Sequence, residues 1–281
     1  EFRRVLFRSG VNFSLFYFML LGDFKSVRKN EELRTYIMLI VGATALITLN
    51  IHSMFPSMIK AFRYAIFQVV TVITTTGYAT TDFAKWPMFS KSILMMLTVV
   101  GACASSTGGG IKVSRLLVGI KCIKREIVQL AHPKSVGIIR IGGKKVGSDI
   151  LRTIYIYFIA YVGILIVSVM LVSLDNFDFE TTFSAVLTTL GNVGPGMAKV
   201  GPMGNFADFS ILSKLVLCFD MLAGRLEIFP FLVLFTAPAW PKQKHTGGYW
   251  RITPYEKIIF PCLFGDKQRQ HFIHFISITK L

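Results

Sequence analysis

Charged residues are scarce in this chain of 281 residues, and acidic residues are the scarcest of them. Asp, Glu, Lys and Arg together make up 16% of the sequence, whereas a soluble domain normally carries about 25%. The 53% of hydrophobic residues and the mean hydropathy of +0.57 agree with this shortage. The composition excludes an ordinary soluble domain and predicts a membrane protein.

Cysteine is also sparse, and its spacing excludes several kinds of site. No Cys-x-x-Cys pair and no His/Cys ligand pattern occur in the sequence, so we interpret the cysteines as lone packing thiols. A nucleophile–base pair and paired carboxylates at catalytic spacing are missing as well. We therefore expect no catalytic residues, no enzyme activity and no bound cofactor. The four cysteines are Cys103, Cys122, Cys218 and Cys262.

The charges that are present are unbalanced, with 31 Lys and Arg against 15 Asp and Glu. A net charge of +16 in a soluble protein would indicate a nucleic-acid partner, but here the basic residues gather in short segments. Residues 22–34, 112–147 and 241–251 are rich in Lys and Arg, whereas 80–88 and 175–182 hold Asp82, Asp175, Asp178 and Glu180 and little positive charge. The positive-inside rule places the basic group in the cytoplasm and the acidic group outside. We therefore expect no nucleic-acid partner.

Long apolar segments alternate with shorter ones. Membrane spans are predicted at 33–51, 89–120, 150–174 and 209–236. The shorter segments 58–75 and 179–190 lie between spans and are predicted as re-entrant helices, because a crossing helix needs about 20 apolar residues. Residues 11–21 are too short for the same reason and are predicted to be the end of a truncated helix. The fold class is thus all-α integral membrane, with two units of span, re-entrant pore helix and span.

The two units are similar in sequence. Shifting 82–101 by 123 positions places it on 205–224 without a gap, which indicates an internal repeat. The identical pairs are Phe83/Phe206, Ala84/Ala207, Ser90/Ser213, Lys91/Lys214, Leu94/Leu217 and Gly101/Gly224. We expect both repeated lysines to extend their ammonium groups to the outer interface.

A glycine-marked turn ends each re-entrant segment. The first turn is Thr74–Tyr78 and the second is Gly191–Gly196. Such a turn in a cation pore directs backbone carbonyls at the ion in place of its water, and glycine tolerates the strained backbone. By register with Gly77, Gly194 is the filter glycine of the second turn, with Gly191 as the alternative. The alternatives without an ion-binding role are a polar turn between helices for the first turn and a surface loop for the second.

A third glycine-rich stretch, Gly101–Gly110, interrupts the predicted span 89–120. It is too rich in glycine for a continuous helix, and irregular backbone at membrane depth is tolerated only where it is buried in protein or lines water. A packing face is one alternative. A phosphate-binding loop is another, but Lys112 does not directly follow the last glycine and no strand precedes the stretch.

Several of these stretches resemble one family. FQVVTVITTTGYATTDFAKWP, GACASSTGGGIKVSRLL, LGNVGPGMAKVGP and MLAGRLEIFPFLVLF resemble the C-terminal half of Trk/Ktr-type potassium-uptake pore subunits, in the TrkH-like branch. The resemblance covers roughly residues 11–240. It implies four repeats around one pore, of which this chain holds the third and fourth. The implied membrane is the bacterial inner membrane, crossed several times.

The resemblance also assigns roles to individual residues. The filter that binds K⁺, the transported ion, would consist of the carbonyls of Thr75, Thr76, Gly77, Asn192, Val193 and Gly194. The gate would consist of Gly101, Ser105, Ser106, Thr107, Gly108, Gly109, Gly110 and Arg225. The implied partners are membrane lipid, a second copy in a homodimer and a cytosolic nucleotide-binding regulatory subunit of the TrkA type.

These inferences divide the chain into six parts. Residues 1–9 match the translation of a sequencing-adapter tail and are excluded as an artefact. The others are 10–32, the end of the second repeat and a cytoplasmic linker; 33–120, the third pore repeat; 121–147, a basic cytoplasmic loop; 148–240, the fourth pore repeat; and 241–281, a tail.

Two alternatives to a pore subunit remain at this stage. One is a truncated, non-conducting fragment or an accessory membrane protein. The other is an intramembrane enzyme, which would have to use Asp220, Arg225 and Glu227, the polar groups predicted near mid-membrane.

Overall fold

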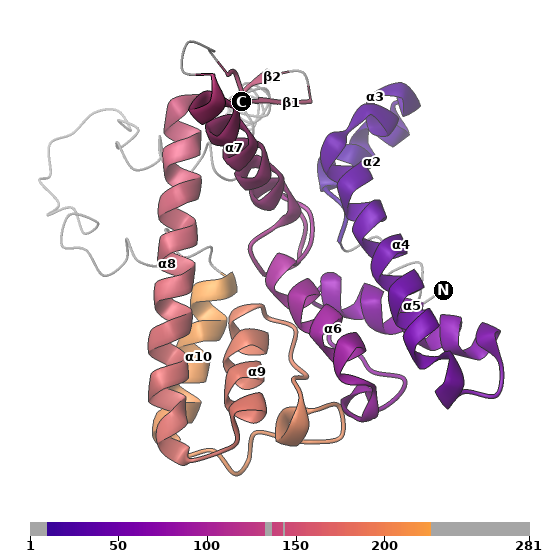
Figure 1. Cartoon of the computed structure of the whole chain (residues 1–281), viewed down its shortest axis with the longest axis vertical. Helices are drawn as coiled ribbons and strands as arrows, with labels where there is room; N and C mark the ends of the chain where they lie inside the picture. Colours follow the sequence, from indigo (N-terminus) through magenta and orange to yellow (C-terminus); the bar gives the residue numbers. More distant parts are fainter. Residues whose placement is uncertain (1–9, 133–136, 143, 226–281) are drawn as a thin grey trace, which may run out of the picture. The chain divides into compact units, whose positions relative to one another are not determined.

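A computed structural model describes residues 10–132, 137–142 and 144–225, and over these residues the chain is mostly helical (Figure 1). They belong to a unit that runs from Glu1 to Ile228. The predicted artefact at 1–9, the tail at 241–281 and the end of the span predicted at 209–236 lie outside the described residues.

Two helices of the described part are long and apolar enough to cross a membrane. They are α4 (Glu31–Ile51), continued by η1 (His52–Met54), and α8 (Ser148–Val172), continued by η3 (Ser173–Asp175). Both lie at predicted spans. Helix α4 begins where it does because the Asn30 side chain accepts a hydrogen bond from the Leu33 amide at 2.9 Å, capping the first turn.

Two shorter helices lie at the predicted re-entrant segments: α5 (Met58–Ile73) and α9 (Phe179–Leu190). At 1.5 Å per residue they are about 24 and 18 Å long, less than the roughly 30 Å of a bilayer core. Asp178 caps α9 by accepting a hydrogen bond from the Thr181 amide at 3.0 Å. A second hydrogen bond, from the Thr181 hydroxyl, lowers the pKa of Asp178.

The segment predicted as an interrupted span at 89–120 is two helices. Helix α6 (Met88–Val100) is followed by irregular backbone and then by α7 (Val113–Ala131). With 13 residues, α6 is about 20 Å long and does not cross a bilayer core. The boundary drawn at residue 120 therefore falls inside α7.

The basic segment 121–147 was expected to be a loop, but much of it is regular structure. It contains the second half of α7 and a hairpin of β1 (Arg140–Ile141) and β2 (Lys144–Lys145). The reason is an apolar stripe among the basic residues: Val118 and Cys122 are buried in one cluster with Ile139, Leu151 and Ile154. This cluster packs α7 against the start of α8.

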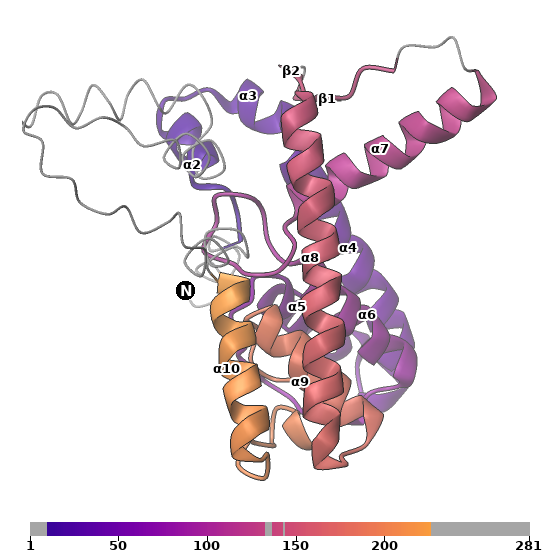
Figure 2. The same cartoon turned by 90° about the vertical axis from the view of Figure 1, so that its left-hand side faces the viewer.

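The remaining described elements are short or incomplete. They are α2 (Phe13–Leu20), α3 (Phe24–Lys29), η2 (Phe83–Lys85), η4 (Ala198–Val200) and α10 (Ile211–Arg225). In Figures 1 and 2, α3, α7 and the hairpin lie at one end of this unit, and the connection from α8 to α9 lies at the opposite end. The basic segments among the described residues thus share one end.

Two clusters of buried side chains hold the helices of the two predicted units, and the first also includes Val193 and Met197 of the second unit. One cluster unites α4, α5 and α6, with Tyr36, Ile73 and Leu94 among its members. Another unites α8, α9 and α10, with Val186 and Leu217. Large apolar side chains on α4 and α8 face outward, as in Met38 (72% exposed) and Ile159 (73% exposed). Outward apolar faces of this kind fit lipid rather than water.

Candidate functional site

The first glycine turn continues directly from the last turn of α5. The Thr75 amide donates to the Val72 carbonyl at 3.0 Å, and the Thr76 amide donates to the Thr71 carbonyl at 2.9 Å. These bonds curl the chain back toward the helix end. Gly77 then takes a φ of 77°, a conformation that a residue with a Cβ rarely adopts.

The second glycine turn has the same hydrogen bonds at an offset of 117 positions, the difference between 192 and 75. The Asn192 amide donates to the Thr189 carbonyl at 3.0 Å, and the Val193 amide donates to the Thr188 carbonyl at 2.9 Å. Gly194 has a φ of 103°. Gly191 instead caps α9 with helical φ and ψ of −76° and −11°, so the conformational demand for glycine falls on Gly194.

The two turns lie against each other. A Cβ built on Gly77 would overlap the Val193 carbonyl oxygen and would lie 3.2 Å from the Pro195 ring. Thr75 and Asn192 both have left-handed backbone, with φ of 53° and 55°. Strained residues of this kind cost about 1–3 kcal/mol each and tend to occur at functional sites. The shared strain shows that the two turns are built alike.

The outer helices follow a different offset. Ser90 and Ser213 are both fully buried, at the offset of 123 found in the sequence. The pore helices match at 117, so the second unit has six more residues between its glycine turn and its last helix, a stretch that includes η4 (Ala198–Val200). Gly101 ends α6, whereas its counterpart Gly224 lies within α10. Within the described residues, the helix of the first unit therefore ends at the repeated glycine, whereas that of the second unit includes it.

The broken stretch is a loop whose two ends meet, the geometry of an Ω-loop. The Lys112 amide donates to the Val100 carbonyl at 2.9 Å. The backbones of Gly101 and Gly110 lie against each other, and these residues have φ of 68° and 78°. A Cβ built on Gly110 would lie 3.0 Å from the Cα of Gly101. We call residues 101–112 the gate loop, after the role that the sequence resemblance predicts for them.

The tip of the gate loop contacts the glycine turns. The Gly109 amide donates to the Thr75 hydroxyl at 3.0 Å, and a Cβ built on Gly109 would lie 2.5 Å from the Gly191 carbonyl oxygen. Within the loop, the Ser106 hydroxyl donates to the Cys103 carbonyl at 2.6 Å. No side chain larger than hydrogen fits between the tip and the turns at Gly109.

Helix α10 connects the second turn to the gate loop. The Asn192 side chain donates to the Met221 carbonyl at 3.1 Å. One turn later, the Arg225 guanidinium donates to the Thr107 carbonyl in the loop tip. Of the predicted gate residues, Ser105 lies apart from this contact, because its carbonyl accepts from the Phe13 amide at 3.2 Å. Predicted filter and gate residues are therefore in contact in the described structure.

Asp220 and Arg225 do not share a site. Asp220 is fully buried and accepts a hydrogen bond from Ser168 on α8 at 2.7 Å, whereas Arg225 faces the gate loop. The third polar group of the enzyme alternative, Glu227, lies outside the described residues. An active site that combines Asp220 with Arg225 is therefore not formed.

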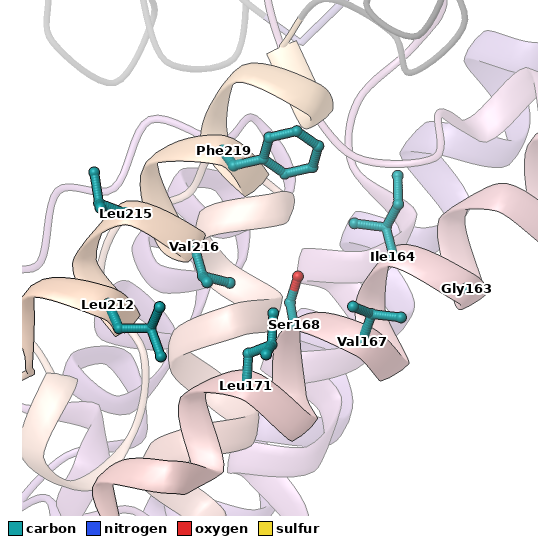
Figure 3. Close-up of a pocket in the computed structure, with 9 residues that line it drawn as sticks. All are labelled: Gly163, Ile164, Val167, Ser168, Leu171, Leu212, Leu215, Val216 and Phe219. Carbon is teal, nitrogen blue, oxygen red and sulfur yellow. The ribbon is translucent and has the colours of Figure 1, made fainter.

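A groove of about 440 Å³ lies between α8 and α10. Figure 3 shows Leu171, Leu212, Val216 and Phe219 among its lining, with Ser168 as the polar side chain at its base. The lining is apolar and includes no residue of either glycine turn. This groove is not part of the candidate ion path.

One ion pair that the sequence did not predict links the two units. The Lys91 ammonium on α6 lies 2.7 Å from the Glu180 carboxylate in the first turn of α9. The expectation that Lys91 extends to the interface was therefore incomplete. Lys214, at the matching position of the second unit, donates to the Ala207 carbonyl at 2.7 Å instead. The repeated lysines indicated a shared role, but the partner of Lys91 is 89 positions away, so no local sequence pattern predicts the pair.

The fold defines a class of protein: it has two apolar helices of membrane length and two short helices that end in abutting glycine turns. This is an α-helical integral membrane protein on the plan of a cation-transport protein. The chain belongs to the TrkH family of cation transport proteins, because the family model matches residues 30–243. The resemblance found in the sequence and the predicted all-α membrane fold are confirmed.

Individual relatives agree with this assignment. The chain is 36% identical over 235 residues to the Trk system potassium uptake protein TrkH of Salmonella typhimurium, covering 83% of this chain and 48% of that protein. It is 29% identical over 234 residues to the Trk system potassium uptake protein TrkG of Escherichia coli, covering 83% of this chain and 48% of that protein. The chain spans about half the length of the curated relatives it matches.

A solved structure gives the same result for the fold. The crystal structure of the potassium transporter TrkH from Vibrio parahaemolyticus matches with a TM-score of 0.77 and 35% identity. The match covers 84% of this chain and 51% of that chain.

Proposed function

We propose that this chain is the C-terminal half of a pore subunit that takes up K⁺, and that it supplies two of four filter turns. The observation that carries the proposal is the pair of abutting glycine turns with matching hydrogen bonds and positive φ at Gly77 and Gly194. Relatives named as potassium uptake proteins support K⁺ as the cargo. Transport of this kind needs no cofactor and no chemical reaction.

The filter in this proposal is backbone. The carbonyls of Thr75, Thr76, Gly77, Asn192, Val193 and Gly194 replace the water around the ion. Helices α5 and α9 end at the two turns, so the negative ends of their dipoles face the same space and favour a cation.

The gate in this proposal is the gate loop together with Arg225. The loop tip lies against the turns through Gly109 and is held by the guanidinium at Thr107. Two effects block the path: the loop fills it, and a fixed positive charge lowers the occupancy of cations. Opening requires the tip to move away from Thr75 and Arg225.

The surroundings of the pore follow from charge. We place the end of the unit with α7 and the hairpin in the cytoplasm of a bacterium and the α8–α9 connection outside its inner membrane. The basic surface of α7 is then available to a TrkA-like regulatory subunit. Lipid covers the outward apolar faces, and a second copy completes a homodimer.

Cysteine labelling tests this orientation. In the full-length protein without its native cysteines, single cysteines near Asp82 and Asp178 should react with an impermeant reagent added outside. Cysteines near Lys124 and Lys144 should react only after the membrane is opened, because basic segments stay inside. Labelling of a cysteine near Lys144 from outside would contradict the proposed orientation.

Growth of bacteria that lack K⁺ uptake tests the function. The full-length protein should restore growth at low K⁺, whereas residues 10–281 alone should not. Two turns supply only half of a four-repeat filter, and the exposed polar backbone of the gate loop would cost several kcal/mol per unsatisfied group in lipid.

Radioactive Rb⁺ uptake and the amount of protein in the membrane should be measured for both forms. Failure of a well-expressed full-length protein to restore uptake would contradict the transport function. Strong uptake by residues 10–281 alone would contradict the count of two turns in four and indicate a self-paired pore.

A further inference from the structure

Two adjacent glutamates begin α4, and they have different environments. Glu31 is partly exposed and pairs with Lys121 on α7. Glu32 is buried, with 9% of its surface exposed. Long carboxylate side chains are almost never buried without partners, so the partners of Glu32 show what it does.

The partners of Glu32 include both ends of the gate loop. At the first end, the Ala104 amide donates to the Glu32 carboxylate at 2.6 Å. At the second end, the carboxylate interacts with the Ser114 amide and with the charge of Lys112. Ala104 and Ser114, which are ten positions apart, thus both interact with one side chain on another helix.

The contact at Ser114 also completes α7. The first turn of a helix has amides without partners inside the helix, and Lys112, at the capping position of α7, makes no capping hydrogen bond with its side chain. A carboxylate at a helix N-terminus also interacts favourably with the helix dipole. Glu32 therefore does for α7 what a capping side chain of its own would do.

The other contacts of the gate loop separate a fixed part from a tip. The fixed part is held by backbone: the Cys103 amide donates to the Gly10 carbonyl at 3.0 Å, beside the contact of Ala104 with Glu32. The tip contacts the first glycine turn through the Gly109 amide and α10 through the Thr107 carbonyl.

We propose that Glu32 is the positioning residue of the gate, a buried carboxylate that fixes both ends of the gate loop so that only the tip moves. This proposal rests on the proposed function of the loop as a gate. The loop can then open without unfolding α7 or separating from α4, because its base remains attached.

The test uses Glu32→Gln in the full-length protein. Glutamine has nearly the same shape, but it lacks the negative charge that interacts with Lys112 and has one acceptor oxygen in place of two, so the ends of the loop are held more weakly. Without regulator, basal Rb⁺ flux into proteoliposomes should rise about threefold to tenfold, a change of up to about 1.4 kcal/mol. The K⁺/Na⁺ preference should not change, because the filter turns are untouched.

The matched control is Glu31→Gln, one position earlier, which removes the pair with Lys121 and should leave basal flux unchanged. Glu32→Asp keeps the charge on a shorter side chain, so its flux should fall between those of the wild type and Glu32→Gln. If Glu32→Gln does not reach the membrane, Glu32→Asp decides the question: a flux above that of the wild type supports the proposal, and a flux equal to that of the wild type overturns it.

Arg225→Ala separates the two possible failures. If Arg225→Ala raises flux while the Glu32 variants behave like the wild type, the proposed gate function of the loop is supported and the proposed role of Glu32 is wrong. If deletion of the loop tip and Arg225→Ala both leave flux unchanged, the gate itself is wrong. Equal effects of Glu31→Gln and Glu32→Gln would also overturn the proposal, because they would reflect the position on α4 rather than the loop.

Discussion

Replacing Arg225 with Ala should raise K⁺ flux through the full-length protein about tenfold. The guanidinium donates to the Thr107 carbonyl in the tip of the gate loop, and a hydrogen bond to a charged group contributes about 1.5–3 kcal/mol. Removing it frees the tip and also removes a positive charge from the path of a cation. Deleting residues 105–109 should raise flux further, because it removes the obstruction itself.

Radioactive Rb⁺ uptake into proteoliposomes, corrected for the amount of protein, is the measurement. Lys214→Ala is the matched control: Lys214 is a cation on the same helix, but it donates to the Ala207 carbonyl, far along α10 from the gate loop. Its flux should equal that of the wild type. A fall in flux for Arg225→Ala, with expression and folding intact, would make the loop a structural element and not a gate.

Local patterns in the sequence predicted much of the fold. The second re-entrant helix was predicted at 179–190 and is α9, Phe179–Leu190, and the first was predicted at 58–75 and is α5, Met58–Ile73. Both predictions rested on apolar length and on a glycine turn, which are properties of neighbouring residues. The break at Gly101 was predictable for the same reason, since dense glycine does not continue a helix.

Contacts between distant residues could not be predicted in the same way. Lys91 and Glu180 are 89 positions apart, and Glu32 and Ala104 are 72 apart, so no spacing rule brings either pair together. Glu32 also follows Glu31 in a segment that reads as a basic, solvated linker. Only the packing of α4 against the base of the gate loop distinguishes the buried carboxylate from the exposed one.

Helix α7 was predicted only in part, because its first residues fall in the span predicted at 89–120 and the rest in the loop predicted at 121–147. The charge of the basic segment concealed a short apolar stripe through Val118 and Cys122. The stripe is at helical spacing, but its partners Leu151 and Ile154 lie on the next helix. A search for periodicity within the basic segment would have found the helix and not its partners.

The filter assignment is the central claim, and it predicts a loss of selectivity on adding a Cβ at Gly77. Serine at Gly77 would have to adopt a φ of 77° and would overlap the Val193 carbonyl oxygen. Serine at Gly194 would meet the strained φ of 103° but no atom within 4 Å. Both changes should disturb the carbonyls, and Gly77→Ser should have the larger effect.

The magnitude follows from how ions are discriminated. A change of about 1.4 kcal/mol in the relative binding of two ions alters their ratio tenfold, and backbone strain at such positions is about 1–3 kcal/mol. We therefore expect the K⁺/Na⁺ preference to fall at least about tenfold in Gly77→Ser. Gly42→Ser is the matched control, since Gly42 lies within α4 and has no atom near a built Cβ.

The decisive measurement is the ratio of K⁺ to Na⁺ uptake by proteoliposomes that contain the full-length protein with Gly77→Ser, Gly194→Ser or Gly42→Ser. We expect a ratio that is lowest for Gly77→Ser, reduced for Gly194→Ser and equal to that of the wild type for Gly42→Ser. An unchanged ratio in both turn variants, with uptake intact, would contradict the assignment of these turns as the filter.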